Sequence, residues 1–368
     1  MLRSVARSLT LSRALIVSFA AVGYFFFPQI HEGMSVPLSS TVPWFLSAWY
    51  HWDANWYMSI AQHGYGWVAG QQSNVAFFPL YPWLMHVLGW ILTGNYLLAG
   101  MLVSLFCLVS GFLFLYRLVR SDFNESIARR TIWLLAIFPT SFFFNAIFTE
   151  SLFLLTSVAC FYYGRRGRWA AAGAWGLLAS LTRISGLLLL VPLAFEFLSQ
   201  RNFSPRRSLR PALLWLALVP AGAAVYSAYL YTGFGQPFAF AETQASGWGH
   251  VITPIWHSFG QDFHYLFGQG ELWVIWDAAA TLLMAVSILL GFKKLPFSYT
   301  LYTLVSLLFP LAGGTMKSMS RYMLVVFPVF IVLAIISRHK PVYWAISACL
   351  LILLAVSTAA FAAGRWIA

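Results

Sequence analysis

Apolar runs long enough to cross a lipid bilayer recur along the whole chain. A helix needs about 20 apolar residues to span the hydrocarbon core. Several of the runs are shorter than this and would need local thinning of the bilayer. We therefore predict an all-α polytopic membrane protein with a single membrane domain over residues 1–368. The eleven predicted spans are 9–27, 96–116, 131–149, 151–164, 169–182, 185–199, 211–231, 272–291, 297–313, 322–337 and 342–362.

The composition excludes the main classes of soluble protein. Charged residues make up 9% of the chain and apolar residues 60%, whereas a soluble domain carries roughly 25% charge. A soluble enzyme, a disordered protein and a disulfide scaffold are all ruled out. The three cysteines lie within apolar runs and form no CxxC pair, which argues against metal or redox chemistry through sulfur.

The basic residues set the expected orientation. The chain has 22 Lys and Arg against 10 Asp and Glu, an excess that in a membrane protein marks cytoplasmic loops rather than a nucleic-acid partner. If the N-terminus is inside and residues 77–93 lie at the interface, most basic residues fall inside. Counting 77–93 as a span would put the clusters at 117–130 and 165–168 outside. The charges thus predict two long outer segments, 28–95 and 232–271, and a C-terminus outside.

The first outer segment contains a carboxylate on an aromatic face. Between residues 44 and 63, Trp49, Trp52, Trp56 and Ile60 recur at the spacing of an amphipathic interfacial helix, with Asp53 on or beside their face. A carboxylate in such a place is costly unless it is partnered or used. We expect a functional role for it, with a capping or ion-paired aspartate as the alternative.

Four further charged residues are candidates for binding an anion or for catalysis. Glu150 lies between two predicted spans, and its alternative is a turn residue that faces water. Arg183 lies between two apolar runs, where an unpaired arginine is expensive. Lys317 and Arg321 lie four residues apart in the outer stretch 313–322, near a predicted helix N-terminus. Basic side chains, hydroxyls and helix N–H groups together can bind phosphate, whereas a tolerated pair of outer charges is the alternative.

The histidines show no HxxH or HExxH spacing. No metal site is predicted, and a role for a divalent cation is left open. An outer carboxylate, a basic phosphate site and aromatic surfaces at lipid depth fit an enzyme that takes a sugar from a lipid phosphate. One rival is a transporter or flippase of a lipid-linked sugar, which midplane charges would favour; Glu196, deep in a predicted span, is the main such charge. The other rival is a noncatalytic envelope-assembly subunit.

Six stretches that follow one another along the chain are specific when taken together. They are 51–65 (HWDANWYMSIAQHGY), 74–82 (NVAFFPLYP), 138–153 (FPTSFFFNAIFTESLF), 181–187 (LTRISGL), 236–248 (QPFAFAETQASGW) and 320–322 (SRY). In these stretches the sequence resembles the PIG-V-type mannosyltransferases, the GPI mannosyltransferase 2 family.

The compact length and the lack of eukaryotic features favour a bacterial or archaeal member of this family. The resemblance implies the GT-C glycosyltransferase fold, with juxtamembrane helices in the first outer loop. It implies an inverting transfer of mannose from a polyprenyl-phosphate donor to a glycan, glycolipid or protein acceptor, on the outer face of the plasma membrane. Asp53 would be the catalytic base, and His51 stands where the family usually has Arg. The residues implied to line the donor or acceptor site are Trp52, His51, Glu150, Arg183, Gln244, Trp248, Lys317 and Arg321.

Overall fold

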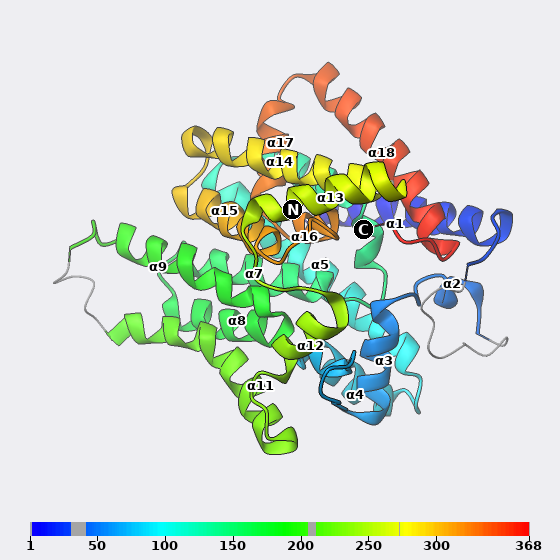
Figure 1. Ribbon diagram of the computed structural model, residues 1–368. Helices are drawn as coiled ribbons and strands as arrows, with labels where there is room; N and C mark the ends of the chain where they lie inside the picture. The colour runs from blue at the N-terminus through cyan, green and yellow to red at the C-terminus, as the bar shows by residue number, and fades with distance from the viewer. Residues whose placement is uncertain (1, 31–41, 205–210, 272, 368) are drawn as a thin grey trace. The chain divides into compact units, whose positions relative to one another are not determined.

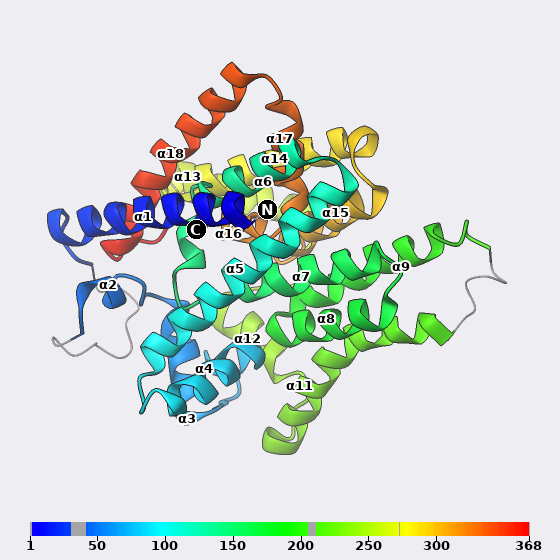
Figure 2. The ribbon, with the colours of Figure 1, turned by 180° about the vertical axis from the view of Figure 1, so that it is seen from behind.

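The computed structural model describes residues 2–30, 42–204, 211–271 and 273–367. Within these ranges the chain forms helices and irregular connections, with no strand, as Figures 1 and 2 show. This confirms the predicted all-α class. Glu32 in the first outer segment, and Arg206, Arg207 and Arg210 among the orienting charges, lie outside the described residues.

The chain divides into two compact units, and the first comprises Met1–Gly64, Tyr81–Ser151 and Phe330–Ala368. Helices α1 and α18 lie side by side in this unit (Figures 1 and 2). They cross closely at Gly23, where a Cβ would overlap the backbone of Ala359. The helices of this unit are α1 (Leu2–Phe26), α2 (Trp44–Ser47), α3 (Asp53–His63), α4 (Leu80–Ile91), α5 (Tyr96–Asp122), α6 (Glu125–Ala136), η2 (Ser141–Phe144), most of α17 (Phe327–Ile336) and α18 (Lys340–Ala362).

The second unit comprises Tyr65–Leu80 and Leu152–Val329. Helices α8 and α11 pack against each other, and the Ser180 hydroxyl donates to the Val219 carbonyl oxygen at 2.6 Å where they meet. Small residues permit such close approach between apolar helices. The helices are η1 (Asn74–Ala76), α7 (Glu150–Gly164), α8 (Trp169–Thr182), η3 (Ile184–Leu189), α9 (Leu190–Ser199), η4 (Pro211–Ala217), α11 (Leu218–Phe234), α12 (Ala239–Trp248), α13 (Ile255–Gln269), α14 (Trp273–Lys294), α15 (Phe297–Leu311) and α16 (Met319–Leu324).

Several helices are long and apolar enough to cross a membrane. Among the described residues these are Leu2–Phe26, Tyr96–Asp122, Pro211–Phe234, Trp273–Lys294 and Lys340–Ala362, with shorter apolar helices at Ile184–Ser199, Phe297–Leu311 and Phe327–Ile336. The chain is thus a multi-pass membrane protein, while the number eleven stays a prediction. Helix α4 has 12 residues, which at about 1.5 Å per residue is too short to cross the hydrocarbon core.

The span predicted over 131–149 is wrong as a continuous helix. Helix α6 ends at Ala136, and the chain continues through irregular backbone and the 3-10 turn η2. Pro139 lacks an N–H and cannot continue a helix. Irregular backbone at membrane depth requires internal partners. Arg13 of α1 supplies them by donating to the Ala136 carbonyl oxygen at 2.8 Å, and to the Ser141 carbonyl oxygen and Asn145 Oδ1 at 2.9 Å each.

The span predicted over 322–337 is also divided. Helix α16 ends at Leu324 and α17 begins at Phe327. Pro328 cannot donate the helical hydrogen bond to the Leu324 carbonyl, so a single helix through this point would lose that bond. The break separates the short helix that carries Arg321 from the buried apolar helix α17.

Candidate active site

Asp53 is the first residue of α3. The continuous amphipathic helix predicted over 44–63 is wrong, because α2 ends at Ser47 and Trp52 takes a positive φ of 47° just before Asp53. The Ala54 N–H donates to the His51 carbonyl oxygen at 3.1 Å, and the Asn55 side chain donates to the Trp52 carbonyl oxygen at 3.1 Å. A carboxylate in the first turn interacts favourably with the helix dipole. Asp53 therefore lies at a helix N-terminus that follows a tight turn, not in the middle of a helical face.

His51 and Trp52 belong to an aromatic cluster in the first unit. The ring of Phe361 in α18 lies 5.3 Å from the His51 ring and 5.2 Å from the Trp52 ring, centroid to centroid. His51 is buried, while Trp52 is half-buried. Phe361 also contacts Phe142 and Phe143, so the turn before Asp53 rests on the core of this unit.

Glu150 is the first residue of α7 and is fully buried. It is therefore not the water-facing turn residue of the alternative interpretation. Tyr57, one turn after Asp53, is hydrogen-bonded through its hydroxyl to Thr149 Oγ1 at 3.4 Å. Thr149 directly precedes Glu150. The two predicted carboxylates thus lie on connected segments of the first unit.

Two of the three basic candidates come together in the second unit around one tyrosine ring. Arg183 follows the end of α8, and its guanidinium carbon lies 5.8 Å from the centre of the Tyr322 ring. The guanidinium carbon of Arg321 lies 5.6 Å from the same centre. Arg321 is buried. Two motifs that lie far apart in the sequence, 181–187 and 320–322, therefore place two arginines and a tyrosine in one neighbourhood.

The loop that carries Lys317 is fixed by two buried carboxylates. Asp262 of α13 accepts from the Met316 N–H at 2.7 Å and the Thr315 hydroxyl at 2.9 Å. Asp277 of α14 accepts from the N–H groups of Ser318 and Ser320, each at 2.8 Å. Burial raises the pKa of the Asp262 carboxyl, and the two donors partly oppose this rise.

These bonds correct one element of the predicted phosphate site. The amides of Ser318 and Ser320 at the start of α16 already donate to Asp277. The prediction that helix N–H groups help to bind phosphate is therefore wrong for the amides of Ser318 and Ser320. The side chains of Arg183, Lys317 and Arg321 remain as the groups that can attract an anion.

Helix α12 connects the predicted Gln244 and Trp248 to the same loop. The His250 N–H donates to the Gln244 carbonyl oxygen at 3.0 Å, and the Thr253 N–H donates to the Ala312 carbonyl oxygen at 2.9 Å. Trp248 packs against Phe77 at 5.7 Å between ring centres. Burial lowers the pKa of His250, and the charges of Lys317 and Arg321 lower it further. His250 therefore lies close enough to Lys317 and Arg321 to feel their charges.

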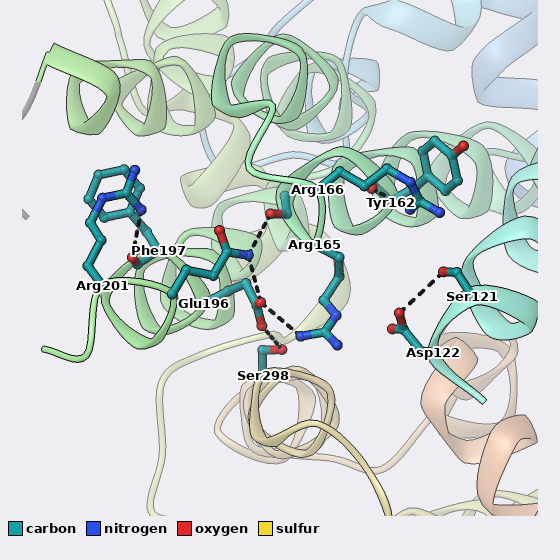
Figure 3. Close-up of polar contacts among 11 residues, drawn as sticks. Ser121, Asp122, Tyr162, Arg165, Arg166, Glu196, Phe197, Arg201 and Ser298 are labelled. Atoms are coloured by element: carbon teal, nitrogen blue, oxygen red, sulfur yellow. Dashed lines mark hydrogen bonds and ion pairs between the residues drawn. The ribbon is translucent and has the colours of Figure 1, made fainter.

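Glu196 is held in a separate network in the second unit (Figure 3). Its carboxylate accepts from Arg165 Nη1 at 2.9 Å, from Gln200 Nε2 at 2.9 Å and from the Ser298 hydroxyl at 2.7 Å. These contacts tie α7, α9 and α15 together. The charge that most favoured a transporter thus has a structural use.

Sequence reasoning missed three residues that organise these sites. Asp277 lies within an apolar run, and an acid in such a run is itself a signal of a specific partner. Arg13 was counted among the orienting charges, because a pattern of charges does not reveal a break in another helix. Asp262 lies in the predicted outer segment 232–271, and its partners Thr315 and Met316 are distant in the sequence. Within the described residues, no group of three or more His, Cys, Asp or Glu is arranged to hold a metal ion.

Comparison with known proteins identifies the family. Residues 11–305 match the model of the mannosyltransferase (PIG-V) family. A GPI mannosyltransferase 2 of Yarrowia lipolytica is 26% identical over 203 residues, which are 53% of this chain and 55% of that protein. The chain thus matches about half the length of this curated relative.

Two solved structures share the fold. The ArnT of Cupriavidus metallidurans, solved with undecaprenyl phosphate, has a TM-score of 0.57 and 15% identity over 92% of this chain and 62% of its own. The Archaeoglobus fulgidus oligosaccharyltransferase, solved with Zn and sulfate, has a TM-score of 0.50 and 16% identity over 97% of this chain and 53% of its own. Both likenesses support the GT-C fold. The match to the family model over residues 11–305, most of its length, shows that the chain belongs to the PIG-V mannosyltransferase family.

Proposed function

We propose that this protein transfers mannose from a polyprenyl-phosphate donor to an acceptor hydroxyl on the outer face of the membrane, with inversion at the anomeric carbon. Asp53 takes the proton of the acceptor hydroxyl as its oxygen attacks that carbon. The bond from the anomeric carbon to the phosphate oxygen breaks, and the lipid phosphate leaves with the electron pair. No covalent enzyme intermediate is required.

The basic cluster of the second unit carries this proposal. Arg183 comes from one stretch of the sequence and Lys317 and Arg321 from another, and the two arginines share the Tyr322 ring. The two acids nearby, Asp262 and Asp277, accept from backbone and hydroxyl donors of the loop. Clustered cations stabilise negative charge that develops on a leaving phosphate. The undecaprenyl phosphate in the related ArnT structure makes a lipid phosphate a reasonable donor for this chain.

The donor class is tested with purified protein in lipid vesicles. Radiolabelled mannose is offered either on polyprenyl phosphate or on GDP, with a crude membrane extract as the source of acceptor. The proposal predicts transfer from the lipid donor alone. Transfer from GDP-mannose alone would contradict it.

The role of the cations is tested by Lys317→Met and Arg321→Met. Each change removes a charge-assisted contact worth about 1.5–3 kcal/mol, so KM for the lipid donor should rise at least tenfold. Lys294→Met is the matched control, because it removes an exposed lysine at the end of α14. An unchanged donor KM in both variants would contradict a phosphate site at this cluster.

A further inference from the structure

The chain after α18 returns to the turn that precedes Asp53. The ring of Trp366 lies 5.2 Å from the ring of Trp52, with an angle of 80° between their planes. Both tryptophans are half-buried. Beneath Trp52 lies the fully buried Phe361, at 5.2 Å between centroids. All these residues belong to the first unit.

A glycine turn fixes the position of Trp366. Gly364 has a φ of 81°, and a Cβ at this position would overlap the Ile30 carbonyl group. The Ile30 N–H donates to the Ala363 carbonyl oxygen at 2.9 Å, and the Arg365 N–H donates to the Ala360 carbonyl oxygen at 3.0 Å. The segment that carries Trp366 is therefore anchored on both sides of the turn.

Trp52 is held in a conformation that a bulky residue rarely adopts. Its φ of 47° and ψ of −112° lie outside the regions open to ordinary L-residues. Strain of this kind is concentrated at functional sites, where the surrounding structure imposes it. Here the strained residue is the immediate neighbour of Asp53.

We propose that Trp52 and Trp366 form a stacking subsite for a pyranose ring beside Asp53. The inference deepens the proposed function and rests on it. An indole face is apolar and polarisable and matches the C–H face of a pyranose, while the sugar hydroxyls at the ring edge stay available for hydrogen bonds. The edge-to-face contact fixes the orientation of the two indoles relative to each other, and Phe361 packs against the Trp52 ring.

The proposal is tested by Trp366→Leu and Trp366→Phe in the intact protein. Leucine keeps apolar bulk without an aromatic face, so KM for one sugar substrate should rise at least tenfold while kcat stays within threefold. Phenylalanine keeps an aromatic face and should restore most of the loss. Trp344→Leu is the matched control, since Trp344 lies near the start of α18 and is 63% exposed. A rise in the acceptor KM assigns the subsite to the acceptor glycan, and a rise in the donor KM assigns it to the donor mannose.

A second measurement separates this inference from the proposed function. In Asp53→Asn protein, saturation-transfer NMR with methyl α-mannopyranoside reports sugar binding without turnover. Loss of this signal when Trp366→Leu is added to the Asp53→Asn protein supports the subsite. Unchanged signal there, or unchanged values of both KM in Trp366→Leu, would overturn it. If the wild-type protein transferred no mannose, the proposed function would fall and the NMR result would still decide the subsite.

Discussion

An anion that binds to Lys317 and Arg321 should change the charge state of His250. Burial and the charges of Lys317 and Arg321 lower the pKa of His250, so the imidazole is neutral at pH 7. The charged groups that act on the ring are these two cations; Asp262 and Asp277, the acids of the same loop, accept from its backbone and hydroxyl donors. A bound phosphate offsets the cations and raises the pKa of His250.

Phosphate binding should therefore be coupled to proton uptake by His250. The affinity for polyprenyl-phosphate mannose, whose phosphodiester does not titrate near neutral pH, should increase as the pH falls through the pKa of His250 in the bound state, and level off below the pKa of His250 in the unbound state. We expect about three- to tenfold tighter binding at pH 5.5 than at pH 7.5, measured by calorimetric titration, because one pKa unit corresponds to about tenfold. His250→Gln should flatten this dependence and the exposed-residue control His257→Gln should not. A pH dependence that survives in His250→Gln would contradict this coupling.

Arg13 supports backbone that cannot form a helix. Arg13→Ala leaves the Ser141 carbonyl oxygen and Asn145 Oδ1 without the Arg13 donor, while the Ala136 carbonyl oxygen still accepts from the Ser141 hydroxyl at 2.8 Å. Since unsatisfied buried groups cost about 1–3 kcal/mol each, we expect a loss of about 2–4 kcal/mol in stability, seen as a lower thermal midpoint in detergent. Arg7→Ala is the control, because Arg7 lies in the same helix and is exposed. Equal midpoints for the two variants would show that the break is supported by other contacts.

At the scale of elements, α13 and α14 determine the conformation of the loop between α15 and α16. Asp262 accepts from the Met316 N–H just before Lys317, and Asp277 accepts from the Ser318 N–H just after it. Ser318 itself takes a positive φ of 70°. A left-handed residue in this place costs about 1–2 kcal/mol. The backbone conformation around Lys317 therefore depends on two acids from other helices.

Asp277→Asn should weaken donor binding more than it slows chemistry. The amide has one acceptor oxygen in place of two, so one of the two loop amides loses its partner at a cost of about 1–3 kcal/mol. We expect a roughly tenfold higher donor KM with little change in kcat. Glu271→Gln, which neutralises an exposed acid just before α14, is the control. A lower thermal midpoint with an unchanged donor KM would assign Asp277 a structural role alone.

At the scale of the whole molecule, the Glu196 network separates an enzyme from a transporter. Glu196→Gln removes the charge that pairs with Arg165 and bonds to Ser298. Because the pair is largely buried, we expect a loss of about 2–3 kcal/mol in stability and mannose transfer within twofold of the wild type. Loss of transfer at full stability would instead show that the Glu196 charge acts directly in function.

The sequence predicts the class of fold well because hydrophobic span length and charge placement act residue by residue along the chain. It predicts Asp53, Arg183, Lys317 and Arg321 as chemically important because each charge stands out against an apolar background. It fails where a partner distant in sequence decides the local structure. The break after Ala136 depends on Arg13, the turn before Asp53 packs on Phe361, and the loop around Lys317 depends on Asp277.

If Asp53 activates the acceptor hydroxyl for mannosyl transfer, its carboxylate is required for turnover and not for donor binding. The most direct measurement compares wild-type and Asp53→Asn protein for transfer of radiolabelled mannose from polyprenyl-phosphate mannose, together with equilibrium binding of that donor. Glu271→Gln serves as the control for the loss of one acidic charge. We expect transfer to fall by at least a hundredfold in Asp53→Asn while donor binding stays within threefold, since general-base catalysis contributes about 10²–10⁴-fold. Equal transfer by wild-type and Asp53→Asn protein would show that Asp53 is not the catalytic base, and Glu150 would then be the next candidate.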